Sequence, residues 1–91
     1  MKDFNLKIGI AGYGAVGKIR RKILDNISGV KIVAISDKNP KYKIQSKGIK
    51  FFDNYKKIFN ENLDILFVSL PPKYAADATK IAIKKKHSCV L

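Results

Sequence analysis

One stretch of the sequence, Lys7 to Asp37, constrains the fold more than any other. It reads KIGIAGYGAVGKIRRKILDNISGVKIVAISD. An apolar run leads into a turn with three glycines, a helical pattern follows, and a second run, rich in β-branched residues, ends in Asp37. This order predicts a strand, a phosphate-binding turn, a helix and a second strand. The two strands should be parallel, because a helix connects them as a right-handed crossover.

The glycine turn has the spacing of a dinucleotide-binding motif. Gly12 suits a tight turn, Gly14 lets a phosphate approach the backbone N–H groups, and Gly17 lets the helix pack against the strand. Three glycines alone are only a turn, but these follow a strand, open a helix and precede an acid 20 residues beyond Gly17. We therefore expect a pyrophosphate at the start of the helix and the adenosine ribose at Asp37.

Asp37 also bears on the choice of cofactor. A carboxylate repels a 2′-phosphate, so Asp37 favours NAD over NADP. Lys38 and Lys41 would soften this preference, and Ser36 would help to hold a phosphate. The expected cofactor is NAD, with NADP as the less favoured alternative.

The helix that follows the glycine turn should bury an apolar stripe. Its apolar residues recur at three- and four-residue spacing, and the basic residues fall largely off that stripe. Ser28 and Gly29 should end the helix, because glycine readily takes the left-handed conformation found there. The residues of the expected buried stripe are Val16, Ile19, Ile23 and Ile27.

The rest of the chain reads as further elements of the same fold. Residues 38–50 show no helical periodicity, so a loop or a single turn is expected. Two prolines should end a strand at residues 64–70, and the alanine-rich segment that follows should be a helix with Ala75, Ala78, Ile81 and Ala82 facing inward. The further expected elements are an edge strand (49–52), about two helical turns around Tyr55, Ile58 and Phe59, the alanine-rich helix (74–86) and a last strand (88–91).

These elements define the expected fold class. The chain has 91 residues and so holds one domain at most, a dinucleotide-binding domain over residues 1–91. We predict an α/β fold: a three-layer, Rossmann-type, doubly wound parallel sheet of about five strands, incomplete at the C-terminus. The unfinished edge beside the fifth strand is a candidate site of self-association into a homo-oligomer.

The composition and charge of the chain bear on its possible binding partners and its location. The net charge is +12, but all except two of the 19 basic residues are lysines spread along the chain, which speaks against specific nucleic-acid binding. No leader peptide or membrane span is evident, so a cytoplasmic protein is expected. Cys89 is the only cysteine and reads as a small buried hydrophobe, and His87 reads as a surface turn residue. No Cys/His cluster supports a metal site.

At these motifs the sequence resembles the N-terminal NAD(P)-binding domain of the glucose-fructose oxidoreductase and inositol dehydrogenase family. The matching parts are the glycine turn, Asp37, the strand DILFVSLPP (64–72), the helix at 74–86 and the start of the last strand. The chain departs from the family pattern at Ala75, where a histidine is common, and at Lys86, where a glycine is usual. It also stops before the family's Glu-Lys-Pro triplet.

The resemblance implies an oxidoreductase that moves hydride to or from a sugar, polyol or related substrate. It also implies that the C-terminal substrate domain, with the catalytic lysine candidate, is missing, so this chain should bind cofactor without turnover. A second hypothesis is a non-enzymatic nucleotide-sensing domain of the potassium-transporter type, which shares the GYGxxG turn. The two prolines argue against that hypothesis.

The residues expected to bind the cofactor come from the motif and from the resemblance. The resemblance adds the loop after the proline-ended strand, which should pass beside the ribose and nicotinamide. Tyr13 reads equally well as an exposed spacer. Tyr74 would reach toward the nicotinamide side of the cofactor or, alternatively, pack in the core at the start of its helix. No catalytic and no metal-binding residue is assigned. The expected cofactor-binding residues are Gly12, Tyr13, Gly14, Ala15, Val16, Gly17, Asp37, Lys38, Ser69, Leu70, Pro71, Pro72 and Tyr74.

Overall fold

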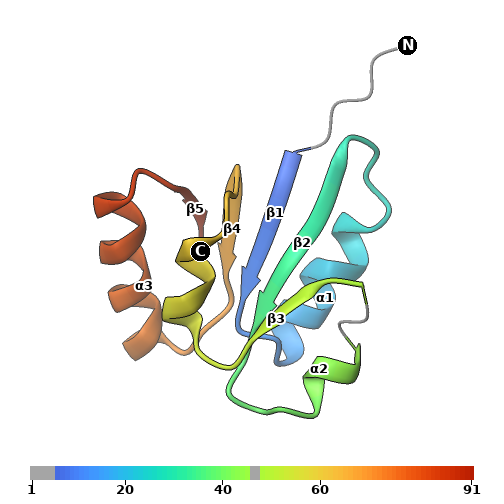
Figure 1. Cartoon of the computed structure of the whole chain (residues 1–91), viewed down its shortest axis with the longest axis horizontal. Coiled ribbons are helices and arrows are strands. Elements are labelled where there is room, and N and C mark those ends of the chain that lie inside the picture. Colours follow the sequence, from blue (N-terminus) through green and yellow to red (C-terminus); the bar gives the residue numbers. More distant parts are fainter. Residues whose placement is uncertain (1–5, 46–47) are drawn as a thin grey trace.

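The computed structural model describes residues 6–45 and 48–91, which form one α/β domain around a five-stranded sheet (Figure 1). All neighbouring strands pair in parallel, in the order β3-β2-β1-β4-β5. This confirms the predicted Rossmann-type sheet of about five strands. The strands are β1 (Leu6–Ala11), β2 (Val30–Ser36), β3 (Lys50–Phe52), β4 (Ile65–Val68) and β5 (Ser88–Val90).

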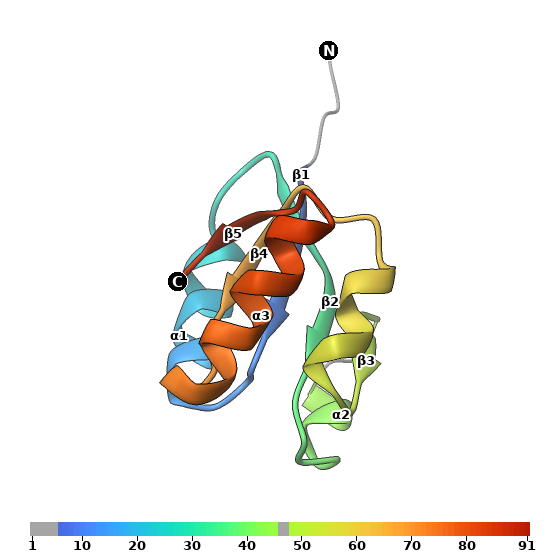
Figure 2. The ribbon, with the colours of Figure 1, turned by 90° about the vertical axis from the view of Figure 1, so that its left-hand side faces the viewer.

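Helices cover both faces of the sheet (Figure 2). On one face α1 packs against β1 and β2; on the other, η1 packs against β1, β2 and β3, while α3 packs against β4 and β5. The single turn expected after Asp37 is α2, and residues 46–47 of that loop lie outside the described residues. The helices are α1 (Ala15–Leu24), α2 (Tyr42–Gln45), the 3₁₀ helix η1 (Tyr55–Asn60) and α3 (Pro72–Lys84).

The face covered by η1 and α3 carries a closed hydrophobic core. Ile58 of η1 and Leu66 of β4 are fully buried, and so are Ala78 and Ala82 of α3. These small alanine side chains let α3 lie close to the sheet, as the sequence predicts. Ala75 and Ile81 are only partly buried and pack against the edge of the same cluster. The inward face of α3 is thus confirmed, with Ala78 and Ala82 more deeply buried than Ala75 and Ile81.

The prediction for α1 is wrong in its orientation. The expected buried stripe is exposed, with Ile19 and Ile23 showing 58% and 57% of their surface. The helix instead turns Gly17 and Leu24 toward the sheet. Each residue advances about 100° around an α-helix, so Ile19 and Ile23 lie about 200° and 240° around from Gly17. They cannot face the sheet together with that glycine.

The end of α1 also differs from the prediction. The helix stops at Leu24, with Asp25 as its C-terminal cap, so Ile27 lies beyond it. Gly29 does have a left-handed φ of 88°, but it belongs to the turn into β2. There its carbonyl oxygen accepts a hydrogen bond of 2.8 Å from the N–H of Leu6. The left-handed glycine therefore lies in the turn just before β2 instead of capping α1.

The ends of β4 and α3 are set by the two prolines. The strand ends at Val68, slightly earlier than expected, and Pro71 is the N-terminal cap of a helix that starts at Pro72. At the other end of α3, Lys86 has a left-handed φ of 59°. This is the position where the family pattern has a glycine, and a residue with a Cβ atom is strained in that conformation. No helix among residues 6–45 and 48–91 is long and apolar enough to cross a membrane.

Candidate cofactor site

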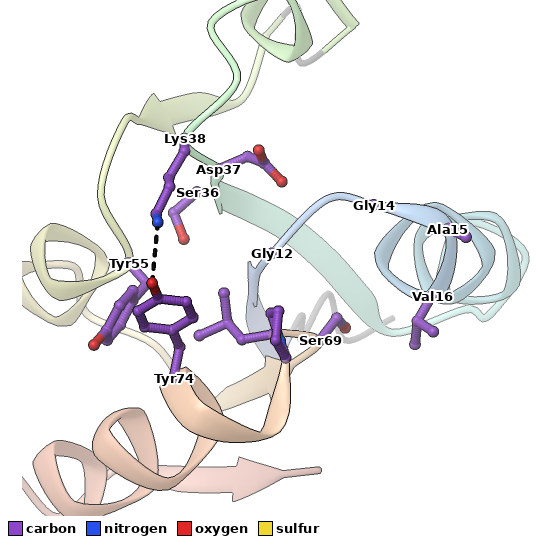
Figure 3. Close-up of a pocket in the computed structure, with 12 residues that line it drawn as sticks. Gly12, Gly14, Ala15, Val16, Ser36, Asp37, Lys38, Tyr55, Ser69 and Tyr74 are labelled. Atoms are coloured by element: carbon purple, nitrogen blue, oxygen red, sulfur yellow. Dashed lines mark hydrogen bonds between the residues drawn. The ribbon is translucent and has the colours of Figure 1, made fainter.

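A cavity of about 500 Å³ opens at the carboxyl ends of β1, β2 and β4 (Figure 3). In open parallel sheets ligands bind at the carboxyl ends of the strands, beside the point where the strand order reverses. Here that point lies between β1 and β4, because β2 and β3 lie on one side of β1 and β4 and β5 on the other. Pocket walls come from the glycine turn, the end of β2, η1 and the loop between β4 and α3. The lining residues are Gly12, Gly14, Ala15, Val16, Ser36, Asp37, Lys38, Tyr55, Ser69, Leu70, Pro71 and Tyr74.

The glycine turn is built so that only glycine fits at two of its positions. Gly12 has a left-handed φ of 94°, and a Cβ atom there would lie 2.6 Å from the carbonyl oxygen of Ser69. A Cβ atom on Gly17 would collide with the carbonyl of Gly12. By contrast, a Cβ atom on Gly14 would meet no atom within 4 Å, so the space beside this residue is open. The turn is therefore packed tightly on the protein side and left free on the cavity side.

The N-terminus of α1 faces this open space. Gly14 is its N-terminal cap and provides no side-chain hydrogen bond, and the first turn contains no acidic residue. The first N–H groups of an α-helix have no partner within the helix, and the helix dipole favours negative charge there. Ala15 and Val16 of this first turn line the cavity. The arrangement suits an anion such as a phosphate group.

Asp37 is held in place by two backbone N–H groups. Its Oδ2 accepts a hydrogen bond of 2.7 Å from the N–H of Tyr13, and its Oδ1 accepts one of 2.9 Å from the N–H of Asn39. A carboxylate oxygen accepts more than one hydrogen bond, so both oxygens retain acceptor capacity toward the cavity. The carboxylate is thus oriented before any ligand arrives and can receive hydroxyl donors.

Ser36, the last residue of β2, adds an unpaired polar atom to the same wall. The residue is fully buried, yet its Oγ has no hydrogen-bond partner within the described part of the chain. Buried hydroxyl groups in proteins nearly always have a partner. Because Ser36 also lines the cavity, its hydroxyl is suited to a polar group of a ligand.

The opposite wall is fixed by Arg20, one of the basic residues that fall off the apolar stripe of α1. Arg20 of α1 donates through Nη1 to the carbonyl of Val68 at 3.1 Å and to the hydroxyl of Ser69 at 3.2 Å. This ties the helix after the glycine turn to the loop after β4. Such a contact joins residues 49 apart in the chain, and no spacing rule predicts it.

Two tyrosines close the end of the cavity nearest β2. Tyr55 donates to Asp77 at 2.5 Å, and this hydrogen bond is the main reason that the pKa of Tyr55 rises to about 12. The rings of Tyr55 and Tyr74 lie 6.0 Å apart. Tyr74 also contacts Lys38, whose hydrogen bond and charge lower the pKa of the Tyr74 hydroxyl.

Most of the residues predicted to bind the cofactor meet at this cavity, and three do not line it. Gly17 faces the turn, and Pro72 is exposed at the start of α3. Tyr13 is neither an exposed spacer nor a cavity residue: its ring is buried against Tyr42, with 5.5 Å between centroids. Its contribution is the backbone N–H that orients Asp37. The assignment of individual residues to cofactor contacts stays a prediction.

Tyr55 is a cavity residue that the sequence pattern predicts only as part of a helix face. Its helical spacing with Ile58 and Phe59 suggests core packing, and nothing nearby in the sequence marks its hydroxyl. The other residues singled out lie away from the cavity. His87 is half-buried, not a surface turn residue, with its ring 5.8 Å from that of Phe59. Cys89 is half-buried beside the α3 core, and this burial raises its pKa.

The sequence was compared with models of protein families and with curated proteins. A family model described as an oxidoreductase family with an NAD-binding Rossmann fold matches residues 6–91. No curated protein matches the chain.

Solved structures show the same fold. The myo-inositol 2-dehydrogenase of Lactobacillus plantarum is 25% identical, with a TM-score of 0.82 over 93% of this chain and 27% of its own. The apo scyllo-inositol dehydrogenase of Lactobacillus casei is 22% identical, with a TM-score of 0.83 over 98% and 28%. The form of the latter enzyme with bound NAD(H) and scyllo-inositol is 21% identical, with a TM-score of 0.82 over 93% and 27%. The chain thus spans little more than a quarter of these relatives.

Proposed function

The chain belongs to the glucose-fructose oxidoreductase and inositol dehydrogenase family, as an NAD-binding Rossmann domain, and from this premise we propose that its cavity binds NAD(H) in preference to NADP(H). The observation that carries the proposal is Asp37, whose carboxylate stands oriented at the end of β2 with acceptor capacity toward the cavity. A ribose with two free hydroxyls suits this carboxylate, and a 2′-phosphate would be repelled by it.

The remaining cavity residues fit a dinucleotide. The open side of Gly14 and the uncapped start of α1 would receive the pyrophosphate. The hydroxyl of Ser36 would find a partner on the ribose or a phosphate. Ser69, Leu70 and Pro71 would line the path toward the nicotinamide half. The bound cofactor would supply the hydride chemistry, while these residues bind it and hold its position.

The class of substrate is proposed from the similarity to solved structures alone. Relatives of this fold include inositol dehydrogenases, and one of them was solved with scyllo-inositol and NAD(H). We infer that the whole protein acts on a sugar, polyol or similar hydroxyl or carbonyl compound. The chain aligns with only about a quarter of these relatives, so we further propose that a separate substrate domain supplies the catalytic groups. Residues 1–91 alone would then bind cofactor without turnover. The family assignment does not favour the nucleotide-sensor hypothesis.

Titration with NADH tests the cofactor proposal directly. Enhancement of NADH fluorescence should saturate with the purified chain, and Asp37→Ala should weaken binding about tenfold, because it removes charge-assisted hydrogen bonds to the ribose. Asp53→Ala is the matched control: it removes the same charge from an exposed site paired with Lys57, 2.9 Å away, and should leave NADH affinity within about twofold. No saturable NADH binding at millimolar concentration, or equal effects of the two variants, would contradict the proposal.

A further inference from the structure

Lys38 and Tyr74 form a contact across the end of the cavity (Figure 3). The Nζ of Lys38 donates to the Tyr74 hydroxyl at 3.3 Å and lies 4.5 Å from the centroid of its ring. Lys38 comes from the loop after β2 and Tyr74 from the first turn of α3, so the contact joins residues of two walls that are 36 positions apart in the chain. Both residues line the cavity, and we call this contact the Lys38–Tyr74 clasp.

Lys38 is the cation best placed for a 2′-phosphate. It directly follows Asp37, where the adenosine ribose would bind under the proposed function, and among the described residues that line the cavity it alone carries a positive charge. Two other lysines lie nearby against aromatic rings, but neither of them lines the cavity. The Nζ of Lys41 lies 5.6 Å from the Tyr42 ring centroid, and that of Lys73 lies 5.7 Å from the centroid of Tyr74.

We propose that the Lys38–Tyr74 clasp sets the preference between NAD(H) and NADP(H), because Tyr74 holds the lysine away from the position of a 2′-phosphate. With NAD(H) the clasp stays closed. With NADP(H) the phosphate competes for Lys38 and must open it. The clasp therefore adds to the discrimination that the Asp37 carboxylate provides by repulsion. This inference rests on the proposed function, since it needs the adenosine end of the cofactor at Asp37.

The clasp has its own spectroscopic reporter. Lys38, by its hydrogen bond and charge, and Lys73, by its charge, lower the pKa of the Tyr74 hydroxyl. If NADPH draws Lys38 away, the tyrosinate absorbance of Tyr74 should appear at higher pH than in the free protein. NADH should leave it unchanged. The signal of Tyr74 is isolated as the difference between the wild type and Tyr74→Phe.

The decisive experiment compares the dissociation constants of NADH and NADPH across four chains: wild type, Tyr74→Phe, Lys38→Met and the double variant. Tyr74→Phe removes the hydrogen bond that holds Lys38 and should improve NADPH relative to NADH about threefold, the size expected for an exposed charge contact. Lys38→Met should weaken NADPH relative to NADH about fivefold. In the Lys38→Met background, Tyr74→Phe should no longer change the ratio. Lys41→Met removes an equal charge from the same loop and should change the ratio by less than about twofold.

The results separate this inference from the proposed function. Equal effects of Tyr74→Phe on both cofactors would show that Tyr74 only packs against them and would overturn the inference. A ratio that still responds to Tyr74→Phe without Lys38 would overturn it as well. In both cases NADH binding by the wild type would leave the proposed function standing. Failure of the wild type to bind NADH would overturn the proposed function and this inference with it.

Discussion

The two faces of the sheet are covered in different ways. On the face covered by η1 and α3, large and small apolar side chains pack together, and Ile58, Leu66 and Ala82 are fully buried. On the other face, Ile8 and Ile10 of β1 are buried as well, but the covering helix α1 leaves its own Ile19 and Ile23 more than half exposed. The difference shows that an apolar stripe identifies a helix as amphipathic without fixing its rotation. Here one glycine contact fixes the rotation instead.

The contact of Gly17 with the turn explains the α1 face. Because this glycine must lie against the backbone of Gly12, the helix presents Leu24 inward and places Arg20 toward β4. The Arg20 guanidinium lies 5.6 Å from the ring of Phe67 and bonds to the end of β4. Polar anchoring therefore replaces apolar packing on this side of the helix, next to the cavity.

The largest effect expected from this comparison is a difference between two truncations to alanine. Leu66→Ala should lower the free energy of unfolding by about 3 kcal/mol, because it opens a cavity in the closed core. Ile23→Ala removes a similar side chain from the α1 face and should change the free energy by less than about 0.5 kcal/mol. Urea unfolding measures both. Similar losses in the two variants would show that the α1 stripe is buried in solution.

A second prediction concerns the bond between η1 and α3 on the closed face. Tyr55→Phe should cost about 1 kcal/mol near neutral pH, since it removes the hydrogen bond to Asp77. The pKa of Tyr55 is raised from 10.0 to about 12, so the fold favours its protonated form. Its contribution should be complete below pH 10 and should vanish as pH rises through about 12. Denaturant unfolding of both chains across this range measures the difference; a gap that persists at high pH would contradict the assignment.

A third prediction, of a similar size but a stabilising direction, concerns the segment where α3 returns to the sheet. Lys86 holds a left-handed φ of 59°, which costs a residue with a Cβ atom about 1 kcal/mol. Lys86→Gly should therefore raise the free energy of unfolding by about that amount. Lys85→Gly is the matched control: its φ of −94° is unstrained, so the added flexibility should destabilise the chain. Thermal unfolding distinguishes them, and a loss of stability in both would show that Lys86 is not strained.

Much of the fold follows from local signals in the sequence. Strand β2 shows β-branched residues, and the paired prolines mark the end of β4 and the start of α3. The rotation of α1 does not follow from its stripe, although the glycine motif holds the missing information. If Gly17 must touch the turn, then Ile19 and Ile23 must face away, and the two expectations conflict. Likewise, helical spacing alone does not separate the 3₁₀ helix η1 from an α-helix.

The site is predictable where it depends on the motif and unpredictable where it depends on tertiary contacts. The glycines and Asp37 are readable because their chemistry sits at fixed spacing. Tyr55 and Arg20 reach the site only through partners far along the chain, Asp77 and Ser69. Tyr13 shows the same limit: its place in the motif suggests a ligand contact, but its ring turns into the core.

The two hydrogen bonds on Asp37 have a consequence for the thermodynamics of association. They freeze the carboxylate in the free protein, and one of them runs to Tyr13, inside the glycine turn itself. The carboxylate that would bind the ribose is thus hydrogen-bonded to the glycine turn that would bind the phosphates. A ligand that contacts both Asp37 and the glycine turn would bind a preorganised surface, so the protein would lose little conformational entropy on binding. Its binding should then carry a small entropic cost of ordering the protein and proceed without a slow rearrangement.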